Sequence, residues 1–281
     1  VLEHFQTDTC DWADIVLPAT TQLEHWDLHL SYGHHYLTLN QPSIQPVGEA
    51  KPNSEIFRLL AAKMGMTDPM FRDDDVTLIR QSLQSNSPKF QGISFDDLVE
   101  RGWVRLNVPT PYLPFANGEF LTPSGKCEFY SQRLKDMGLD PVPTYTPPYE
   151  SPERDARLTE RFPLTLISSP AHQFLNTTFV NIGALRRAAR EPECLLHPAD
   201  AERRGIGVGM RVVVHNDRGA FTAIARVEDT IREGVVWAPS IWWGKFAADG
   251  ANANQTTWQR ETDMGHGPVF YDNQVEVGIA D

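Results

Sequence analysis

The residues best suited to chemistry lie in a long polar stretch near the C-terminus. Between Trp243 and Gln274 about 30 residues lack a strand or helix pattern, and an irregular segment of that length in a compact domain is usually functional or disordered. Neutral amide and hydroxyl side chains suit a heteroaromatic, amide-like ligand such as a pterin or a nucleobase. The alternative is a polar loop that satisfies only its own backbone. The candidate ligand-binding residues in this stretch are Asn252, Asn254, Gln255, Thr256, Thr257 and Gln259.

A second polar cluster follows a predicted strand, in the sequence SSPAHQFLNTTFVN. Ligands commonly meet the ends of strands, so these side chains form a second candidate site. A lone histidine such as His172 is more often a hydrogen-bonded structural residue. We include it among the candidates because polar residues surround it in the sequence. The cluster contains Ser168, Ser169, His172, Gln173, Asn176, Thr177 and Thr178.

Other patterns give no catalytic or metal-ligating residue. His25 and His29 lie four residues apart beside Glu24, a spacing that permits zinc, but no HExxH pattern accompanies them and a strand or loop is expected there. Asp73 to Asp75 lack the spacing of an EF-hand and suit the positive end of a helix dipole. The sequence contains no nucleophile elbow, Walker loop or dinucleotide-binding glycine turn.

Residues 162–281 have the pattern of a small β domain. Six strands in about 120 residues favour a closed barrel, because closure removes exposed strand edges. A tight hairpin is expected at Asn216–Gly219, and one short helix at PADAERRG. The candidate strands are FPLTLIS, ECLLH, MRVVVHN, AFTAIARV, GVVWAP and QVEVG.

Residues 1–65 have the pattern of an α/β layer. We expect a strand over residues 1–7, a short turn or helix in TDTCDWAD and a buried strand in IVLPA. A helix over 53–65 begins with Asn53 or Ser54 as its cap and ends at Gly65. Strand, crossover and helix in this order suggest the tail of an α/β domain.

Residues 66–161 are predicted to be connecting structure with two short helices, VTLIRQSL and FDDLVERG. Ser94 and Asp97 have the spacing of a capping box, and Gly102 can end the second helix. The proline-rich run DPVPTYTPPYESP predicts a stiff linker, which places the domain boundary just after it. The predicted domains are therefore 1–65, 66–161 and 162–281.

Composition limits the possible partners. The 281 residues include 37 acidic and 25 basic side chains, a net charge of −12, which argues against a general nucleic-acid or anionic-membrane binder. The longest apolar run, VVWAPSIWW, is about half of what a bilayer crossing requires, so no membrane span is predicted. Arginine side chains could still bind the phosphates of a small ligand at a single site. Most arginines of the last segment, Arg186, Arg187, Arg203 and Arg204 among them, are expected to be solvated.

Four segments in order resemble the molybdopterin oxidoreductases of the dimethyl sulfoxide reductase family. HFQTDTCDWADIVLPATTQLE resembles the T-x-T-A-x-x-A-D-I-V-L-P pattern near the end of their large α/β domains, and NGEFLTPSGKCEFYS resembles their F-x-T-P-S-G-K segment. LLHPADAERRGIGVGMRVVVHNDRG and GANANQTTWQRETDMG resemble their C-terminal molybdopterin-dinucleotide-binding domain. Cys10 departs from the usual Ala, and Thr256 stands where an apolar residue is common.

The resemblance implies a mixed fold and a cofactor. The fold would be the tail of a Rossmann-like α/β domain followed by a six-stranded double-psi β-barrel. The full enzyme would hold molybdenum, or sometimes tungsten, between two pyranopterin guanine dinucleotides. By position, one loop would contact a pterin or its phosphates through His172, Gln173, Asn176 and Thr177, and the other would contribute Asn252, Asn254, Thr257 and Asp263.

The resemblance also implies that this chain is the C-terminal part of a larger enzyme and is inactive alone. The family's metal ligand and its iron–sulfur cysteines lie far upstream of the matching segments, and Cys10, Cys127 and Cys194 form no such cluster. A small-molecule substrate and an electron-transfer subunit would belong to the full enzyme, while substrate and compartment stay open. The competing hypothesis is a stand-alone, non-catalytic binding module with the same barrel. A barrel hydrolase or decarboxylase would need a nucleophile–base pairing that the sequence lacks.

Overall fold

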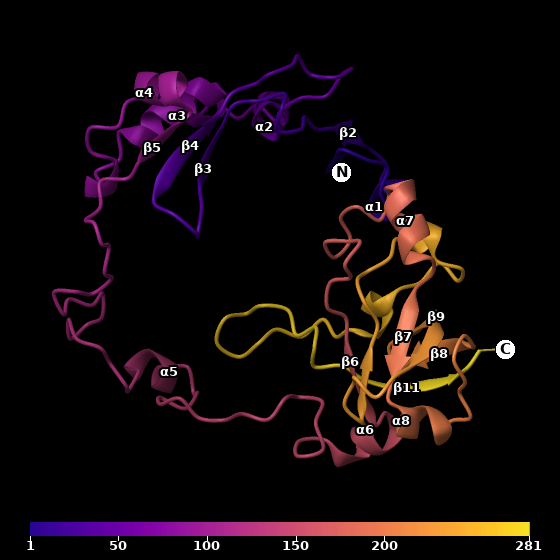
Figure 1. Ribbon diagram of the computed structural model, residues 1–281. Coiled ribbons are helices and arrows are strands. Elements are labelled where there is room, and N and C mark those ends of the chain that lie inside the picture. Colours follow the sequence, from indigo (N-terminus) through magenta and orange to yellow (C-terminus); the bar gives the residue numbers. More distant parts are fainter. Residues whose placement is uncertain (281) are drawn as a thin grey trace. The chain divides into compact units, whose positions relative to one another are not determined.

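The computed structural model describes residues 1–280, and the chain folds into two compact units, Val1–Lys126 and Cys127–Asp281. Each unit has its own hydrophobic core. Figure 1 shows the elements of the two units in colours that follow the sequence. Among residues 1–280, no helix has both the length and the apolar character needed to cross a bilayer. Residues 66–126 therefore belong to the same compact unit as the N-terminal segment, and residues 127–161 to the same unit as the barrel. The three domains predicted from the sequence, with boundaries after residues 65 and 161, stay a prediction.

The second unit is built on a closed six-stranded barrel, which confirms all six predicted strands. Neighbouring strands run in the order β10-β6-β11-β8-β9-β7, and β7 pairs with β10 to close the ring. The pairs β6–β10 and β7–β9 are parallel and the other four are antiparallel. The strands are β6 (Leu164–Ile167), β7 (Glu193–Leu196), β8 (Arg211–His215), β9 (Ala220–Val227), β10 (Val235–Trp237) and β11 (Gln274–Ile279).

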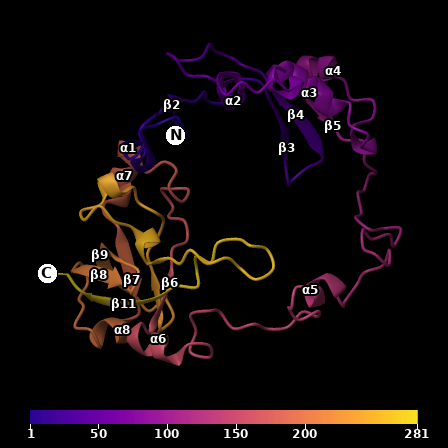
Figure 2. The same cartoon turned by 180° about the vertical axis from the view of Figure 1, so that it is seen from behind.

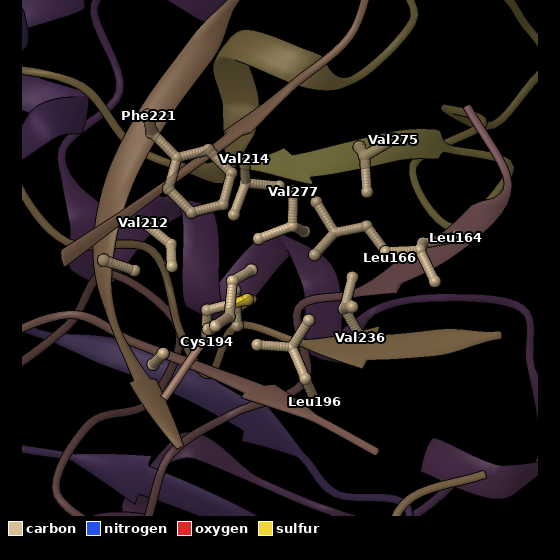
Figure 3. Packing of buried hydrophobic residues seen from close by; sticks show 14 of the residues in the cluster. Leu164, Leu166, Cys194, Leu196, Val212, Val214, Phe221, Val236, Val275 and Val277 are labelled. Atoms are coloured by element: carbon tan, nitrogen blue, oxygen red, sulfur yellow. The ribbon is translucent and has the colours of Figure 1, made fainter. Parts of the chain in front are cut away.

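Alternation of side chains along each strand fills the barrel interior. In β8, Val212 and Val214 are buried, and in β9 the buried positions are Phe221, Ala223 and Ala225. Period-two alternation places these residues on one face of the strand, and small alanines beside a phenylalanine let the facing side chains interdigitate. Figure 3 shows Phe221, the valines and the leucines pointing toward one another inside the ring.

Short helices connect the strands of this unit. The predicted helix α8 (Pro198–Glu202) is present, and the His197 side chain accepts a hydrogen bond from Ala199 N at its start (3.2 Å). The predicted hairpin at residues 216–219 is also present, closed by Asn216 N to Gly219 O (3.0 Å). The sequence did not predict α5 (Gln132–Asp136), α6 (Ala156–Arg161), α7 (Gly183–Ala189), or the 3₁₀ turns η3 (Gly244–Phe246) and η4 (Ala253–Thr256).

The first unit contains a three-stranded antiparallel sheet, β3-β4-β5, that was not predicted from the sequence. Leu37 and Leu39 of β4 pack against α3 and α4, the two helices predicted in the supposed connecting region. Ser94 caps α4 and Gly102 ends it in the left-handed conformation, as predicted. The elements of this sheet and its cover are β3 (Asp27–Leu30), β4 (Tyr36–Asn40), α3 (Asp75–Leu83), α4 (Phe95–Arg101) and β5 (Trp103–Arg105), with η1 (Pro69–Phe71) and η2 (Pro88–Phe90) between them.

The N-terminal α/β elements are shorter than predicted. They are β1 (Leu2–Glu3), α1 (Asp8–Asp11), β2 (Leu17–Pro18) and α2 (Asn53–Lys63). The strands β1 and β2 form only a two-residue parallel pair, and Ile15 is 67% exposed, so the prediction of a buried strand in IVLPA was wrong. A strand of a parallel sheet is buried only where a layer packs on its faces, and the exposed Val16 and Leu17 agree with Ile15. The predicted cap of α2 was also wrong: Pro52 takes that position, and Ser54 Oγ instead donates to Asp75 (2.6 Å).

A buried carboxylate, Glu24, organises the turn that precedes β3. Its oxygens accept hydrogen bonds from Thr21 N (2.6 Å), Thr21 Oγ1 (2.7 Å) and Val47 N (2.6 Å). These donors, the Thr21 backbone first, lower the pKa of Glu24, and His4 adds a small electrostatic contribution. The ionised carboxylate therefore joins residue 21 to residue 47, on either side of the β3–β4 pair.

We predict that Glu24 makes the first unit acid-sensitive. Because its pKa is lower in the folded chain than in the unfolded chain, its contribution is complete above the unfolded pKa of about 4.3 and is lost as the pH falls through the folded value. Thermal unfolding between neutral and acidic pH should therefore show a smaller acid-side loss of stability in Glu24→Gln. The exposed Glu119→Gln is the control, and an equal acid-side loss in wild type and Glu24→Gln would contradict this role.

We also predict that the barrel core tolerates truncation poorly. Leu196 is fully buried in the barrel cluster, so Leu196→Ala should lower the free energy of unfolding by about 2–5 kcal/mol in denaturant titration. Val208→Ala removes methyl groups from an exposed valine of the same unit and should change it little. Equal effects of the two substitutions would mean that Leu196 is not part of the stabilising core.

Candidate functional site

The candidate site lies where β6 and β10 end together. Because these strands are parallel neighbours, the segments that follow them leave from the same end of the barrel. Ala238 N to Ile167 O (2.9 Å) and Ser240 N to Ser169 O (2.8 Å) continue the pairing beyond both strands. We call residues 168–182 the β6 loop and residues 239–263 the β10 loop. The two polar clusters singled out in the sequence are therefore neighbours in the fold.

Two side chains of the β10 loop hold the backbone of the β6 loop. Ser240 Oγ donates to Asn176 O (2.6 Å), and Trp243 Nε1 donates to Thr177 O (2.9 Å). Both bonds use carbonyl groups of the β6 loop, so they fix its path without engaging the side chains of Asn176 and Thr177. The backbone of the loop is therefore fixed, while these two side chains stay free to bind a ligand.

An apolar cluster lies beneath the two loops. Phe174 and Val180 of the β6 loop and Trp242 of the β10 loop are buried together. The rings of Phe174 and Trp242 meet edge to face, with centroids 5.2 Å apart and planes at 86°. Buried aromatic area is a large source of stabilisation, so this cluster anchors both loops to each other.

The backbone at this end of the barrel is strained. Asn176, Phe179 and Ser240 have φ angles of +53°, +77° and +65°. Asparagine visits this left-handed region with little penalty, whereas phenylalanine and serine rarely do. Such conformations persist only where the surroundings impose them, and they concentrate at functional sites. The buried Ser240 is held in place by its own bond to Asn176 O.

The structure brings the four predicted residues of the β6 loop together on the surface. His172, Asn176 and Thr177 are exposed, and Gln173 is half-buried. None of these four side chains forms a hydrogen bond to another residue in the range 1–280. Their donors and acceptors are therefore available to a ligand.

The predicted residues of the β10 loop divide into two groups. Asn252 is occupied within the loop, because its Oδ1 accepts from Asn254 N (3.0 Å) and its Nδ2 donates to Trp242 O (2.8 Å). Thr257 Oγ1 likewise donates to Asn254 O (2.9 Å). Asn254 and Gln255 are exposed. Asn252 and Thr257 thus shape the loop, and Asn254 presents its side chain outward.

Two further candidate residues of this loop, Thr256 and Asp263, lie in surroundings that differ from those of Asn254. Thr256 is fully buried, and its Oγ1 donates to Ala253 O (2.9 Å), so its inclusion among the ligand donors was wrong. Asp263 belongs to a hairpin over 260–269, which is closed by Thr262 N to Gly267 O (2.8 Å) and a bridge between Glu261 and Pro268. Figures 1 and 2 show the yellow segment that contains this hairpin projecting from the barrel. Asp263 lines a pocket with residues of the segment before the barrel, Pro141 and Thr144 among them.

The residues that support the β10 loop from behind could not be recognised as a group in the sequence. Arg218, Asn216, Asn273 and the buried Glu150 form a polar network beneath η4. Gly219 is needed there, because a Cβ atom at this position would lie only 2.7 Å from Gln255 O. The one available signal was the hairpin sequence Asn-Asp-Arg-Gly, which indicates a turn but not what the turn contacts.

Two of the arginines expected to be solvated are not. Arg204 has 14% of its side chain exposed, pairs with Glu276 and donates to Asp200 O (3.0 Å). Arg186 lies over the ring of Phe246, 3.8 Å from its centroid, and donates to Val180 O (2.8 Å). Their aliphatic stems and planar guanidinium groups make them structural parts of the barrel.

Two parts of the chain match two family models. Residues 1–63 match the family described as molybdopterin oxidoreductase, and residues 164–274 match the molydopterin dinucleotide binding domain. The chain belongs to the molybdopterin oxidoreductases. The second match covers β6 through the start of β11 and includes both loops of the candidate site, so these loops are part of the dinucleotide-binding region of the family.

Relatives of known name support this assignment. The chain is 37% identical over 278 residues to "Probable oxidoreductase YoaE" of Bacillus subtilis, covering 99% of this chain and 39% of that protein. It is 30% identical to a putative catalytic subunit of dimethyl sulfoxide reductase from Halobacterium salinarum, covering 97% of this chain and 32% of the relative. The structure of acetylene hydratase from Pelobacter acetylenicus has the same fold, with a TM-score of 0.76, 22% identity, and coverage of 99% of this chain and 40% of that one.

The donors at the candidate site fit a molybdopterin dinucleotide better than a metal ion. Amide, hydroxyl and imidazole groups at the barrel end can pair with the amide-like edges of pterin and guanine rings. Within residues 1–280 no three His, Cys, Asp or Glu side chains form a group that could hold a metal. Burial raises the pKa of the Cys194 thiol to about 12, so this cysteine offers no thiolate at neutral pH.

We predict that Ser240 holds the β6 loop in place. Ser240→Ala leaves the carbonyl of Asn176 without its partner and should lower the free energy of unfolding by about 1–3 kcal/mol. Thr178→Ala removes an exposed hydroxyl from the same loop and should have little effect. Denaturant titration of both variants checks this, and equal stabilities would show that the bond contributes nothing.

Proposed function

We propose that the end of the barrel formed by the β6 and β10 loops binds the dinucleotide of a pyranopterin guanine dinucleotide carrying molybdenum or tungsten. The observation that carries the proposal is the parallel pairing of β6 with β10, which joins two polar loops at one place. His172, Gln173, Asn176 and Thr177 would contact one part of the cofactor. Asn254 would contact another, with Asn252 and Thr257 shaping its loop, while Asp263 would join the site from the neighbouring hairpin.

When bound, the cofactor supplies two-electron redox chemistry or oxygen-atom transfer at its metal. The residues of this chain bind and orient it. Neutral donors at Gln173, Asn176 and Asn254 give directional hydrogen bonds without introducing a charge, and the Phe174–Trp242 cluster excludes water beneath them. His172 has two ring nitrogens and can donate to a phosphate or accept from a ring N–H.

The finer features of the fold and enzyme belong to the same proposal. We infer a double-psi crossing of the barrel strands, a Rossmann-like domain to which β1, β2 and α2 belong, and an iron–sulfur cluster held by sequence outside this chain. The chain spans 32% to 39% of the length of the two relatives named above, so activity would need the longer enzyme and this chain alone would be inactive. The name "catalytic subunit" of one relative supports an electron-transfer partner, and a small molecule would be the substrate.

Cofactor content of the full-length protein tests this function. We predict that His172→Ala and Asn254→Ala each weaken cofactor binding about two- to tenfold, the value of one lost hydrogen bond, and lower the molybdenum or tungsten and pterin recovered per polypeptide. Elemental analysis and pterin fluorescence measure both quantities. Thr230→Ala, an exposed hydroxyl after β9 at the opposite end of the barrel, is the control.

Two results would contradict the proposal. Unchanged cofactor content in both variants would show that these loops do not hold the cofactor. A full-length protein that contains neither metal nor pterin would instead favour the alternative, a non-catalytic binding module that retains the barrel.

A further inference from the structure

An ion pair between the buried Glu150 and the partly exposed Arg218 joins the segment before the barrel to the β8–β9 hairpin. Glu150 is 2% exposed, and its carboxylate accepts from both terminal nitrogens of Arg218, the Nη2 contact being 3.2 Å, and from Gln274 N (2.7 Å). Asp272 accepts from Tyr149 N (2.6 Å) and Glu150 N (2.8 Å), which fastens the same segment to the barrel. A carboxylate this deeply buried needs a partner, and the guanidinium fork supplies it.

The rest of the Arg218 guanidinium is directed at the β10 loop. Its Nε donates to Thr256 O (2.7 Å), and Nη2 also donates to Asn273 Oδ1 (3.2 Å). Thr256 is the last residue of η4, so this contact holds the end of the turn that carries Asn254. One planar side chain therefore connects a buried carboxylate to the backbone of the candidate site.

Two asparagines add further contacts to Thr256. Its carbonyl also accepts from Asn216 Nδ2 (2.9 Å), and its hydroxyl accepts from Asn273 Nδ2 (2.9 Å). Asn216 is half-buried and Asn273 is buried, so both donors serve the loop rather than a ligand. A loop fixed in this way loses little conformational entropy when a ligand binds.

Two aromatic rings extend the support outward. The Arg218 guanidinium carbon lies 5.3 Å from the centroid of Trp258, and Arg260 lies 4.7 Å from the same ring and 4.2 Å from that of Tyr149. These cation–π contacts tie the residues just after η4 to the segment that carries Glu150.

We propose that Arg218, paired with Glu150, is the positioning residue for the cofactor-binding end of the barrel: it fixes η4 so that Asn254 meets the ligand in a preformed loop. The inference rests on the function proposed above and adds to it a residue that does not itself contact the cofactor. It assigns the anchor to Glu150, which lies outside the region matched by the dinucleotide-binding family model.

The chain offers a matched control in the same turn. Asp217, next to Arg218, pairs with Arg161, and both side chains are more than half exposed. Like Arg218–Glu150, this is an arginine–carboxylate pair that joins the hairpin to the segment before the barrel. Within residues 1–280, however, no contact joins either of its side chains to Thr256 or η4. Loss of the Asp217–Arg161 pair should therefore leave the β10 loop unchanged.

The experiment compares Arg218→Gln, Arg218→Lys and Asp217→Asn in the full-length holoenzyme. Hydrogen exchange of residues 252–257 reports on the loop directly, through the amides of Gln255 and Thr257, which donate to Asn252 O and Asn254 O. We expect about tenfold faster exchange in both Arg218 variants, lower metal and pterin content, and no change in Asp217→Asn. Arg218→Lys keeps the charge near Glu150 but loses the planar fork, so it tests the proposal if Arg218→Gln does not fold.

The outcomes separate this inference from the proposed function. Unchanged exchange at 252–257 in an Arg218 variant that folds overturns the positioning role, as does faster exchange with full cofactor content. If His172→Ala and Asn254→Ala lower cofactor content while Arg218→Lys does not, only the positioning role fails. If none of His172→Ala, Asn254→Ala, Arg218→Gln and Arg218→Lys lowers the cofactor content, the proposed function fails as well.

Discussion

The parallel hydrogen bonding of β6 with β10 is the constraint on which the candidate site depends. Three other strands lie between these two in the chain, and only their pairing brings the loops after them to the same end of the barrel. The contacts between the two loops follow from it. Ser240 reaches Asn176 O, and Trp242 meets Phe174, because the strands that deliver them lie side by side.

The polar groups at this end of the barrel have two distinct tasks. Ser240, Thr256 and Asn273 are buried and form hydrogen bonds within the protein, so they fix the backbone of the two loops. Asn176, Thr177 and Asn254 keep their side chains exposed on that fixed backbone. Since a buried polar network is stable only when its members are satisfied, the inner layer must be complete before the outer layer has a defined geometry.

Much of the barrel could be predicted from sequence, because alternating strands such as AFTAIARV bury one face and expose the other. The polar loops could be predicted for a similar reason: their composition leaves donors for a ligand. The burial of Thr256 could not be predicted, because a residue's type does not reveal whether its side chain points from the loop to the solvent or to the protein interior. Ser240 was missed because its left-handed φ and its bond to a distant carbonyl leave no local pattern. The buried strand predicted at Ile15 failed because hydrophobicity does not say whether a covering layer is present.

The register between β6 and β11 has a consequence for how the site forms. Thr165 pairs with Gln274, 109 residues further along the chain, and the Gln274 side chain donates to Thr165 Oγ1 and to Glu150 O. Contacts so distant in sequence make folding slow, since a long loop must close before they contribute stability. During synthesis the ring stays open until β11 has left the ribosome. The loops at its end therefore reach their final shape only after translation of the barrel is complete, so a ligand that needs both loops can bind only after that point.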